Sequence, residues 1–433
     1  MKRVILLSVA CNLLILNNRL LAQQESVAQD SLKKIDPLEW RFNKYRFGGY
    51  GEILYQHMDY GADRYTDSEK GAPKTNRSYI SVPRAVLAFD YKFRDDIVLS
   101  SELEIEYGGA GAAMELEYEE AGEYEMEIEK GGEIELEQFH ITKRFSNAFN
   151  IRAGHMIVPV GITNAHHEPT LFFTSARPEG EMTILPCTWH ETGISVLGYI
   201  SGFRYELMVV NGLDPNGFSS ENWIQGGKQG MFETAVMTSP AFAGRLEYSG
   251  IKNLRIGASG YFNNTAKNAS KPEKMNGIKA PVSIGTFDVQ YLTKNFAVRG
   301  NAIYGNLGAS RRLSQINKSI SKATNFARTP VAKNAVSYSI EAGYNVLSFF
   351  NTKEKLMPFA RYEYYNSAQN VESGMAEMPR NKRDVYTIGL NYYLLPNMVL
   401  KADYSKRTLN RGDYNDENTF SLALAYTGWF FQK

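Results

Sequence analysis

The clearest pattern in the sequence lies in residues 385–431, which read VYTIGLNYYLLPNMVLKADYSKRTLNRGDYNDENTFSLALAYTGWFF. Every second residue at its start is large and apolar, as in Tyr386, Ile388 and Leu390. The alternation restarts after a Leu-Pro-Asn turn and again after a polar stretch, and three aromatic residues end it. A period of two is typical of β-strands with one apolar and one polar face. Because the polar faces carry Lys, Asp, Ser and Thr, we interpret these strands as part of a barrel with lipid outside and water inside.

The same alternation recurs along the chain and predicts sixteen strands. They are expected near residues 46–59, 78–93, 97–107, 134–144, 149–160, 190–200, 203–213, 241–249, 253–263, 282–292, 295–305, 335–347, 356–366, 384–395, 398–408 and 418–431. Short connections alternate with long ones, and the long ones are 60–77, 108–133, 161–189, 214–240, 264–281, 306–334, 367–383 and 409–417.

Barrels of the bacterial outer membrane have short periplasmic turns, long extracellular loops and an even number of strands. We therefore expect an all-β fold, a transmembrane antiparallel β-barrel of sixteen strands. Its expected place is the outer membrane of a Gram-negative bacterium, in contact with membrane lipid and lipopolysaccharide.

The N-terminus has the pattern of a secretory signal peptide in residues 1–22, with a basic start, an apolar core and a Leu-Leu-Ala end. A lipoprotein signal cleaved before Cys11 is the alternative, but residues 8–10 match it poorly. Residues 23–45 are polar and are interpreted as a periplasmic lead-in to a barrel at 46–433. Removal of the signal leaves Cys187 as a single thiol, which excludes an internal disulfide framework.

The phase of each strand predicts which side chains point into the barrel. A barrel of this size encloses an aqueous lumen rather than a packed core. We expect the lumen to be lined by charged residues, among them Arg84, Arg245, Arg255, Arg299, Arg361, Lys401, Glu102 and Glu104. For any one of these residues, solvation of the lumen explains the charge as well as a selective role does.

One segment, RAGHMIVPVG at residues 152–161, leads into a long third loop. With this segment, a signal peptide, sixteen strands and an aromatic-rich last strand, the chain resembles the phosphate-selective porin O and P group and the general trimeric porins. The resemblance implies a homotrimer whose third loop folds into the barrel as a constriction. Here that loop is 162–189, and its Arg177, Glu179 and Glu181 would face the pore. A lid on the surface is the alternative, and the arginine ladder of the phosphate porins cannot be placed, so phosphate is not expected as the substrate.

Neither an active site nor a metal site is predicted. The runs His166-His167-Glu168 and His190-Glu191, with His155 and Cys187 nearby in the sequence, match no tight ligand spacing. Ser195 lies near His190 in the sequence, but no third catalytic partner can be identified. No basic tract suggests binding to nucleic acid. The sequence therefore predicts no enzyme and no cofactor.

The most unusual stretch is residues 102–137, which contain fourteen glutamates and one cation, Lys130. Without this stretch and the signal peptide, the chain has 44 basic and 33 acidic residues, a net charge of +11. Within it, loop 108–133 is expected to form an acidic hairpin in which glutamates alternate with Met114, Leu116, Tyr118, Tyr124, Met126 and Ile128.

A lone two-stranded hairpin is marginal, and opposed like charges weaken it further. The six apolar residues are therefore expected to bind a partner. By resemblance to the trimeric porins, that partner is a neighbouring subunit. The alternatives are another outer-membrane or surface protein, bound divalent cations, or a solvated spike without a partner.

These patterns favour a porin for passive diffusion of small hydrophilic solutes or ions, filtered at the third loop and by the field of the lumen charges. Because the chain outside the acidic stretch is basic, a weak preference for anions is expected. The alternative is a non-conducting barrel that scaffolds a surface complex or an adhesin through the acidic hairpin.

Overall fold

The computed structural model of the chain describes residues 40–61, 69–109, 132–230, 234–320 and 329–433. The chain divides into two units, residues 1–41 and 42–433. Only Trp40 and Arg41 of the first unit are described, so the predicted signal peptide and most of the predicted lead-in lie outside the described residues. All of the described strands belong to the second unit.

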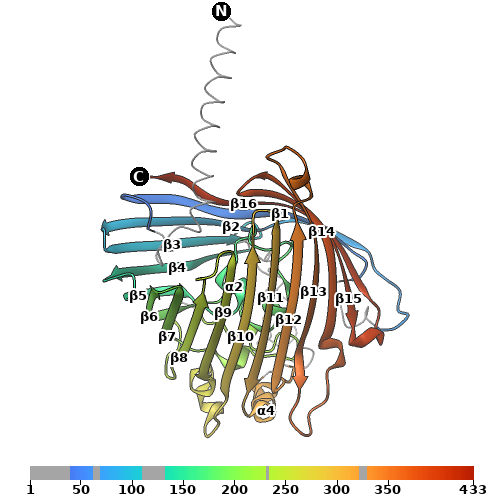
Figure 1. The fold of residues 1–433 in the computed structure, drawn as a ribbon. Coiled ribbons are helices and arrows are strands. Elements are labelled where there is room, and N and C mark those ends of the chain that lie inside the picture. The colour runs from blue at the N-terminus through green and yellow to red at the C-terminus, as the bar shows by residue number, and fades with distance from the viewer. Residues whose placement is uncertain (1–39, 62–68, 110–131, 231–233, 321–328) are drawn as a thin grey trace, which may run out of the picture. The chain divides into compact units, whose positions relative to one another are not determined.

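Sixteen strands, each antiparallel to its neighbours in the chain, close into one barrel (Figure 1). The last strand closes the barrel against the first, with Tyr50 opposite Thr427. The strands are β1 (Tyr45–Met58), β2 (Arg77–Arg94), β3 (Ile97–Glu106), β4 (Glu133–Arg144), β5 (Asn150–Ile157), β6 (His190–Ile200), β7 (Phe203–Val210), β8 (Ala241–Tyr248), β9 (Leu254–Asn264), β10 (Pro281–Leu292), β11 (Phe296–Leu307), β12 (Asn334–Tyr344), β13 (Lys355–Asn370), β14 (Lys382–Leu395), β15 (Met398–Leu409) and β16 (Glu417–Gln432). The prediction of a sixteen-stranded antiparallel barrel is confirmed.

The described helices are short and lie between the strands. The α-helices are α2 (Ile162–Ala165), α3 (Glu179–Ile184) and α4 (Ser310–Ile320). The 3-10 helices are η1 (Pro215–Gly217), η2 (Gln225–Gly227), η3 (Thr265–Asn268), η4 (Pro272–Met275), η5 (Val346–Phe349), η6 (Pro379–Asn381) and η7 (Asn410–Gly412). Among the described residues, no helix combines the length and the apolar character needed to cross a bilayer.

The connections follow the predicted alternation of short and long with one departure. Residues 345–354, between β12 and β13, form a connection longer than residues 410–416, between β15 and β16. The reason is that β12 ends at Tyr344, three residues earlier than expected, and η5 follows it, whereas β15 and β16 each extend one residue further into the second connection than expected. Strand β5 also ends earlier than expected, at Ile157, because the chain there leaves the wall.

The outward face of the barrel is apolar and aromatic. Leu246, Ile340 and Ile388 are each more than half exposed. Near the short turns, aromatic rings meet in pairs with centroids 4.7 to 6.4 Å apart: Tyr91–Phe93, Phe145–Phe149, Phe203–Tyr248, Tyr291–Phe296, Tyr344–Phe349 and Tyr426–Phe430. An exposed apolar surface with an aromatic girdle is what a barrel presents to lipid, and in water it would favour aggregation.

The inside of the barrel holds a cluster of buried apolar side chains contributed by loops as well as strands. Trp189, Phe218 and Trp223 are each 1% exposed or less. The indole nitrogen of Trp223 donates to the carbonyl oxygen of Ala332 at 3.2 Å, which joins two long connections.

The predicted acidic hairpin falls mostly outside the described residues, which omit 110–131. The six apolar residues expected to bind a partner belong to that range, so their role stays a prediction.

Candidate functional site

The connection between β5 and β6, residues 158–189, is called the inner loop, because its described side chains reach the inner faces of strands on the other side of the barrel. Its two ends are joined where the amide of Val158 donates to the carbonyl of Trp189 at 2.8 Å. The chain turns at Gly161, which has a φ of 88°. A side chain there would lie 2.2 Å from a carboxylate oxygen of Glu181, so the turn requires glycine.

Asn164 and Glu181 hold the base of the inner loop. The amide side chain of Asn164 donates to the carbonyl of Val158 at 2.6 Å and accepts from the amide of Trp189 at 2.6 Å. Glu181 accepts from the backbone amide of Asn164 at 2.7 Å and from Asn301 on β11 at 3.1 Å. Burial raises the pKa of Glu181. With only 3% of its surface exposed, Glu181 fastens the loop to the wall, whereas the sequence suggested a residue facing the pore.

The middle of the inner loop is fixed to β14 and β15 by polar contacts. The ammonium group of Lys401 donates to the carbonyl oxygens of Pro169, Phe172 and Thr174, the last two at 2.9 Å. Further along β15, Asp403 accepts from the backbone amide of Ser175 at 2.5 Å. These side chains satisfy backbone groups that would otherwise be buried without partners.

An aromatic contact accompanies these hydrogen bonds. The ring of Phe173, which is 1% exposed, stacks on Phe359 of β13 with centroids 5.2 Å apart. Asn391 of β14 donates to the carbonyl of Phe173 at 3.0 Å. The apolar part of the loop is therefore buried against the barrel wall, as the run Leu171-Phe172-Phe173 suggests, although Leu171 itself is exposed.

The start of α3 is held by charges on two strands. Arg407 of β15 donates from Nε to both carboxylate oxygens of Glu179, at 2.6 and 2.8 Å. The hydroxyl of Tyr365 donates to the same carboxylate at 3.0 Å. Glu363 of β13 accepts from the amides of Glu179 and Gly180, at 3.2 and 2.8 Å. An acidic group is favourable at this position because the first amides of a helix lack partners within it.

Arg177 points back into the loop, where it donates to the thiol sulfur of Cys187 and to the hydroxyl of Thr188, the latter at 3.1 Å. A cavity of about 30 Å³ lies between this part of the loop and β13–β16. Six charged residues of opposite sign are among those that line it: Arg177, Arg361, Arg407, Glu179, Glu363 and Asp403. The charges around this narrow space therefore balance.

The residues expected to line the lumen all form contacts inside the barrel. Lys401 binds the inner loop, and Glu102 accepts a hydrogen bond from Gln138 at 2.5 Å. The others form ion pairs: Arg84 with Glu52 at 3.2 Å and with Glu104 at 3.9 Å, Arg245 with Asp288 at 2.7 Å, Arg255 with Glu247 at 3.4 Å, Arg299 with Glu341 at 2.9 Å, and Arg361 with Glu341 at 3.0 Å.

Sequence reasoning does not single out Arg407 or Asn391, which contact the inner loop directly. Arg407 stands in the same phase as Lys401 and Asp403, so the alternation of β15 is the signal that finds it. Asn391 has no such signal, because a small polar residue on an inward face is unremarkable in a barrel.

No known family model matches the sequence. An uncharacterised protein of Aquifex aeolicus (strain VF5) is 28% identical over 388 residues, which cover 89% of this chain and 79% of that protein.

Solved structures of outer-membrane proteins resemble the barrel. The outer membrane channel DcaP of Acinetobacter baumannii has a TM-score of 0.53 at 12% identity, covering 89% of this chain and 97% of that one. OmpF of Salmonella typhi, solved with daunomycin, has a TM-score of 0.53 at 14% identity, covering 89% and 98%. The chain has the porin fold. OprB of Pseudomonas putida agrees, with a TM-score of 0.52 at 9% identity, covering 89% and 94%. Identities this low show the fold alone and do not assign the chain to the phosphate-selective porins.

Proposed function

We propose that the protein is a porin in the outer membrane of a Gram-negative bacterium, through which small hydrophilic solutes or ions diffuse passively. One observation carries the proposal: a long loop turns inward within a closed barrel and is bound to the opposite wall. The contacts of Lys401, Asp403 and Arg407 hold it there. A loop held inside the lumen narrows the path and sets the size of solute that passes.

The membrane placement is supported by the outward face. Residues such as Ile388, 65% exposed, would be unfavourable in water and are stable in lipid. The aromatic pairs near the short turns suit the level of the lipid headgroups. Charged side chains such as Arg245, Arg361 and Lys401 are buried inside the barrel, where partners of opposite charge or backbone carbonyls compensate them.

The ion preference follows from the field inside the pore. Without the acidic stretch and the signal peptide the chain carries a net charge of +11, which favours a weak preference for anions. The six charges around the cavity beside the inner loop balance, so the preference should be small. We also propose a homotrimer in which the acidic hairpin packs on a neighbouring subunit, on the strength of its sequence pattern.

Swelling of proteoliposomes tests the proposal. Liposomes that contain the purified protein should swell in isosmotic solutions of small sugars, and the rate should fall steeply as the sugar grows. Heat-denatured protein is the control. Swelling no faster than that of the control for every sugar would favour the non-conducting scaffold instead.

A further inference from the structure

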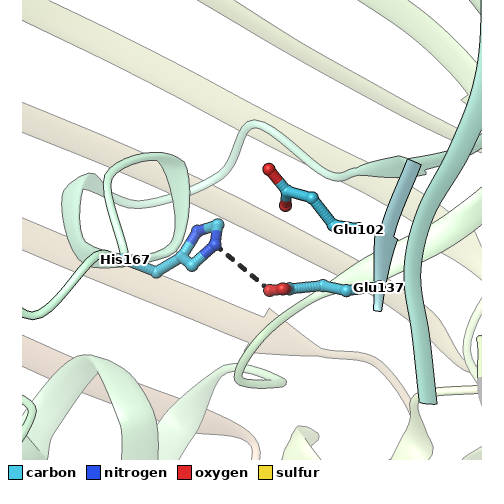
Figure 2. Close-up of side chains that lie close together, drawn as sticks. All are labelled: Glu102, Glu137 and His167. Carbon is cyan, nitrogen blue, oxygen red and sulfur yellow. Dashed lines mark ion pairs between the residues drawn. The ribbon is translucent and has the colours of Figure 1, made fainter. Parts of the chain in front are cut away.

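Three ionisable side chains from different parts of the chain, one of them on the inner loop, meet inside the barrel. Glu102 lies on β3, Glu137 on β4, and His167 on the inner loop just after α2 (Figure 2). One ligand atom from each lies within 4.8 Å of the others, and Nε2 of His167 is 3.1 Å from a carboxylate oxygen of Glu137. Glu137 is fully buried and His167 is 6% exposed.

A β-bulge on β4 brings the two carboxylates together. Glu102 pairs with Gln138, but the next residue, Leu103, pairs with Leu136, so Glu137 is left as the extra residue. Bulges of this kind re-aim side chains and are common beside functional sites. Here the bulge lets Gln138 donate to one oxygen of Glu102 at 2.5 Å while Glu137 points inward.

The protonation of His167 is constrained by its other nitrogen. Nδ1 lies 3.0 Å from the carbonyl oxygen of Asn164, which can only accept, so Nδ1 carries the proton. In the neutral ring Nε2 then carries a lone pair, and this lone pair points at Glu137. Neither Nε2 nor the facing oxygen of Glu137 has a hydrogen bond to any of the residues that the structure describes. Two electron-rich atoms at 3.1 Å need a positive charge between them or on the ring.

The hydrogen bonds that His167 and Glu137 make with other residues resemble those of metal ligands. A ligating histidine generally donates its second N–H to a backbone carbonyl, and ligating carboxylates are themselves hydrogen-bonded. His167 donates to Asn164 in this way, and the other oxygen of Glu137 accepts from the hydroxyl of Tyr50 at 3.0 Å. The ring of Tyr50 also meets the imidazole edge-on, with centroids 5.6 Å apart.

The surroundings carry an excess of negative charge. Glu104 lies close enough to Glu137 for the two carboxylates to repel each other, and Glu52 and Glu104 are both buried. Two cations oppose these three carboxylates and that of Glu102: Arg84, which is within ion-pair distance of Glu52 and Glu104 and donates to the carbonyl of His167 at 3.1 Å, and Arg177. Within the described part of the chain, both carboxylate oxygens of Glu104 are without a hydrogen bond. Buried charges are costly unless they are paired or coordinate a metal, so this region favours a further cation.

We propose that Glu102, Glu137 and His167 bind a divalent transition-metal ion, with Zn²⁺ the best fit. Imidazole with two carboxylates suits Zn²⁺, whereas Ca²⁺ takes six to eight oxygens and Mg²⁺ keeps several waters. Tetrahedral ligands at about 2.0 Å from zinc stand about 3.3 Å apart, close to the spacing of His167 and Glu137. The ion ties the inner loop to β3 and β4, and a water molecule would complete its four ligands.

Zinc binding by the purified full-length chain tests the site. Protein freed of its affinity tag and of metal is titrated with ZnCl₂ against a fluorescent chelator, and bound zinc is counted by mass spectrometry after gel filtration. One zinc per chain is expected, with no displacement by a hundredfold excess of Mg²⁺ or Ca²⁺. If the protein binds no zinc at micromolar concentration, the proposal is wrong, and His167 is a protonated partner of Glu137.

Variants assign the ligands. Glu137→Gln and His167→Ala should each weaken zinc binding at least a hundredfold, and Tyr50→Phe, which removes a hydrogen bond to Glu137, about 10–100-fold. His57→Ala is the matched control, because His57 is an exposed histidine on β1 whose ring bonds only Ser78 among the contacts described.

Each variant must keep its heat-modifiable band on a gel, which shows that the barrel is folded. If Glu137→Gln or His167→Ala does not fold, Glu102→Gln is tested in its place. Unchanged affinity in Glu137→Gln and His167→Ala would refute the site. Because binding is measured in detergent, the result does not depend on whether the barrel conducts.

Discussion

Removing the ammonium group of Lys401 should release the middle of the inner loop. Lys401→Met keeps the length of the side chain and takes away the donor for three backbone carbonyls, those of Pro169, Phe172 and Thr174. Lys401 is 3% exposed, so water has little access to these groups in the folded state. Each buried acceptor left without a partner costs about 1–3 kcal/mol.

The lower end of that range, applied to three carbonyls, gives about 3 kcal/mol. Desolvation of the ammonium group, which the variant no longer suffers, argues for the lower end. Since about 1.4 kcal/mol is a factor of ten, the opening equilibrium of this part of the loop should rise about a hundredfold. The barrel itself should stay folded, because the lost contacts belong to the loop.

Hydrogen exchange of the folded protein in detergent measures this opening. Amides within residues 169–176 should exchange about a hundredfold faster in Lys401→Met, while those of β15 keep their rates. Lys406→Met is the matched control on the same strand, because Lys406 is half exposed and pairs with Asp416. Equal exchange in the two variants would refute the idea that Lys401 anchors the loop.

Three further outcomes are expected. Deletion of residues 169–176 should raise single-channel conductance and admit larger solutes, because it removes the segment bound by Lys401 and Asp403; an unchanged solute cutoff would favour a surface lid. Deletion of residues 112–130 should leave the barrel folded but weaken the oligomer in mild detergent, and an equally stable oligomer would exclude the latch. Reversal potentials in a salt gradient should show a weak preference for anions, whereas a clear preference for cations would mean that carboxylates control the path.

The barrel could be predicted closely because its pattern is local. The alternation in residues such as Leu400, Ala402 and Tyr404 needs no knowledge of distant residues, and it fixes both the strand and its lipid-facing side. The phase also places Lys401 and Asp403 on the inward face, where the structure has them buried.

The partners of those inward charges could not be predicted from phase. Arg407 and Glu179 are 228 residues apart, and their pairing depends on how far the inner loop crosses the barrel. For the same reason Glu181 is expected to face the pore, whereas in the structure it is bound by Asn164 and Asn301. A period of two says which way a strand residue points and nothing about the path of a loop.

The proximity of Glu102, Glu137 and His167 was even harder to predict from the sequence. These residues come from two strands and a loop, so they have no ligand spacing that a motif could match. In the sequence Glu137 is one glutamate of an acidic run, and His167 is one of a pair in a polar segment. The bulge at Glu137, which brings them together, depends on the register between β3 and β4 and has no mark in the sequence.

Single-channel recording of the purified protein in a planar bilayer tests the central claim most directly. The account predicts discrete, ohmic current steps, with a larger unit step after deletion of residues 169–176 from the inner loop. A folded, heat-modifiable protein that inserts into the bilayer and yields no steps above the lipid background, with or without that segment, would contradict it.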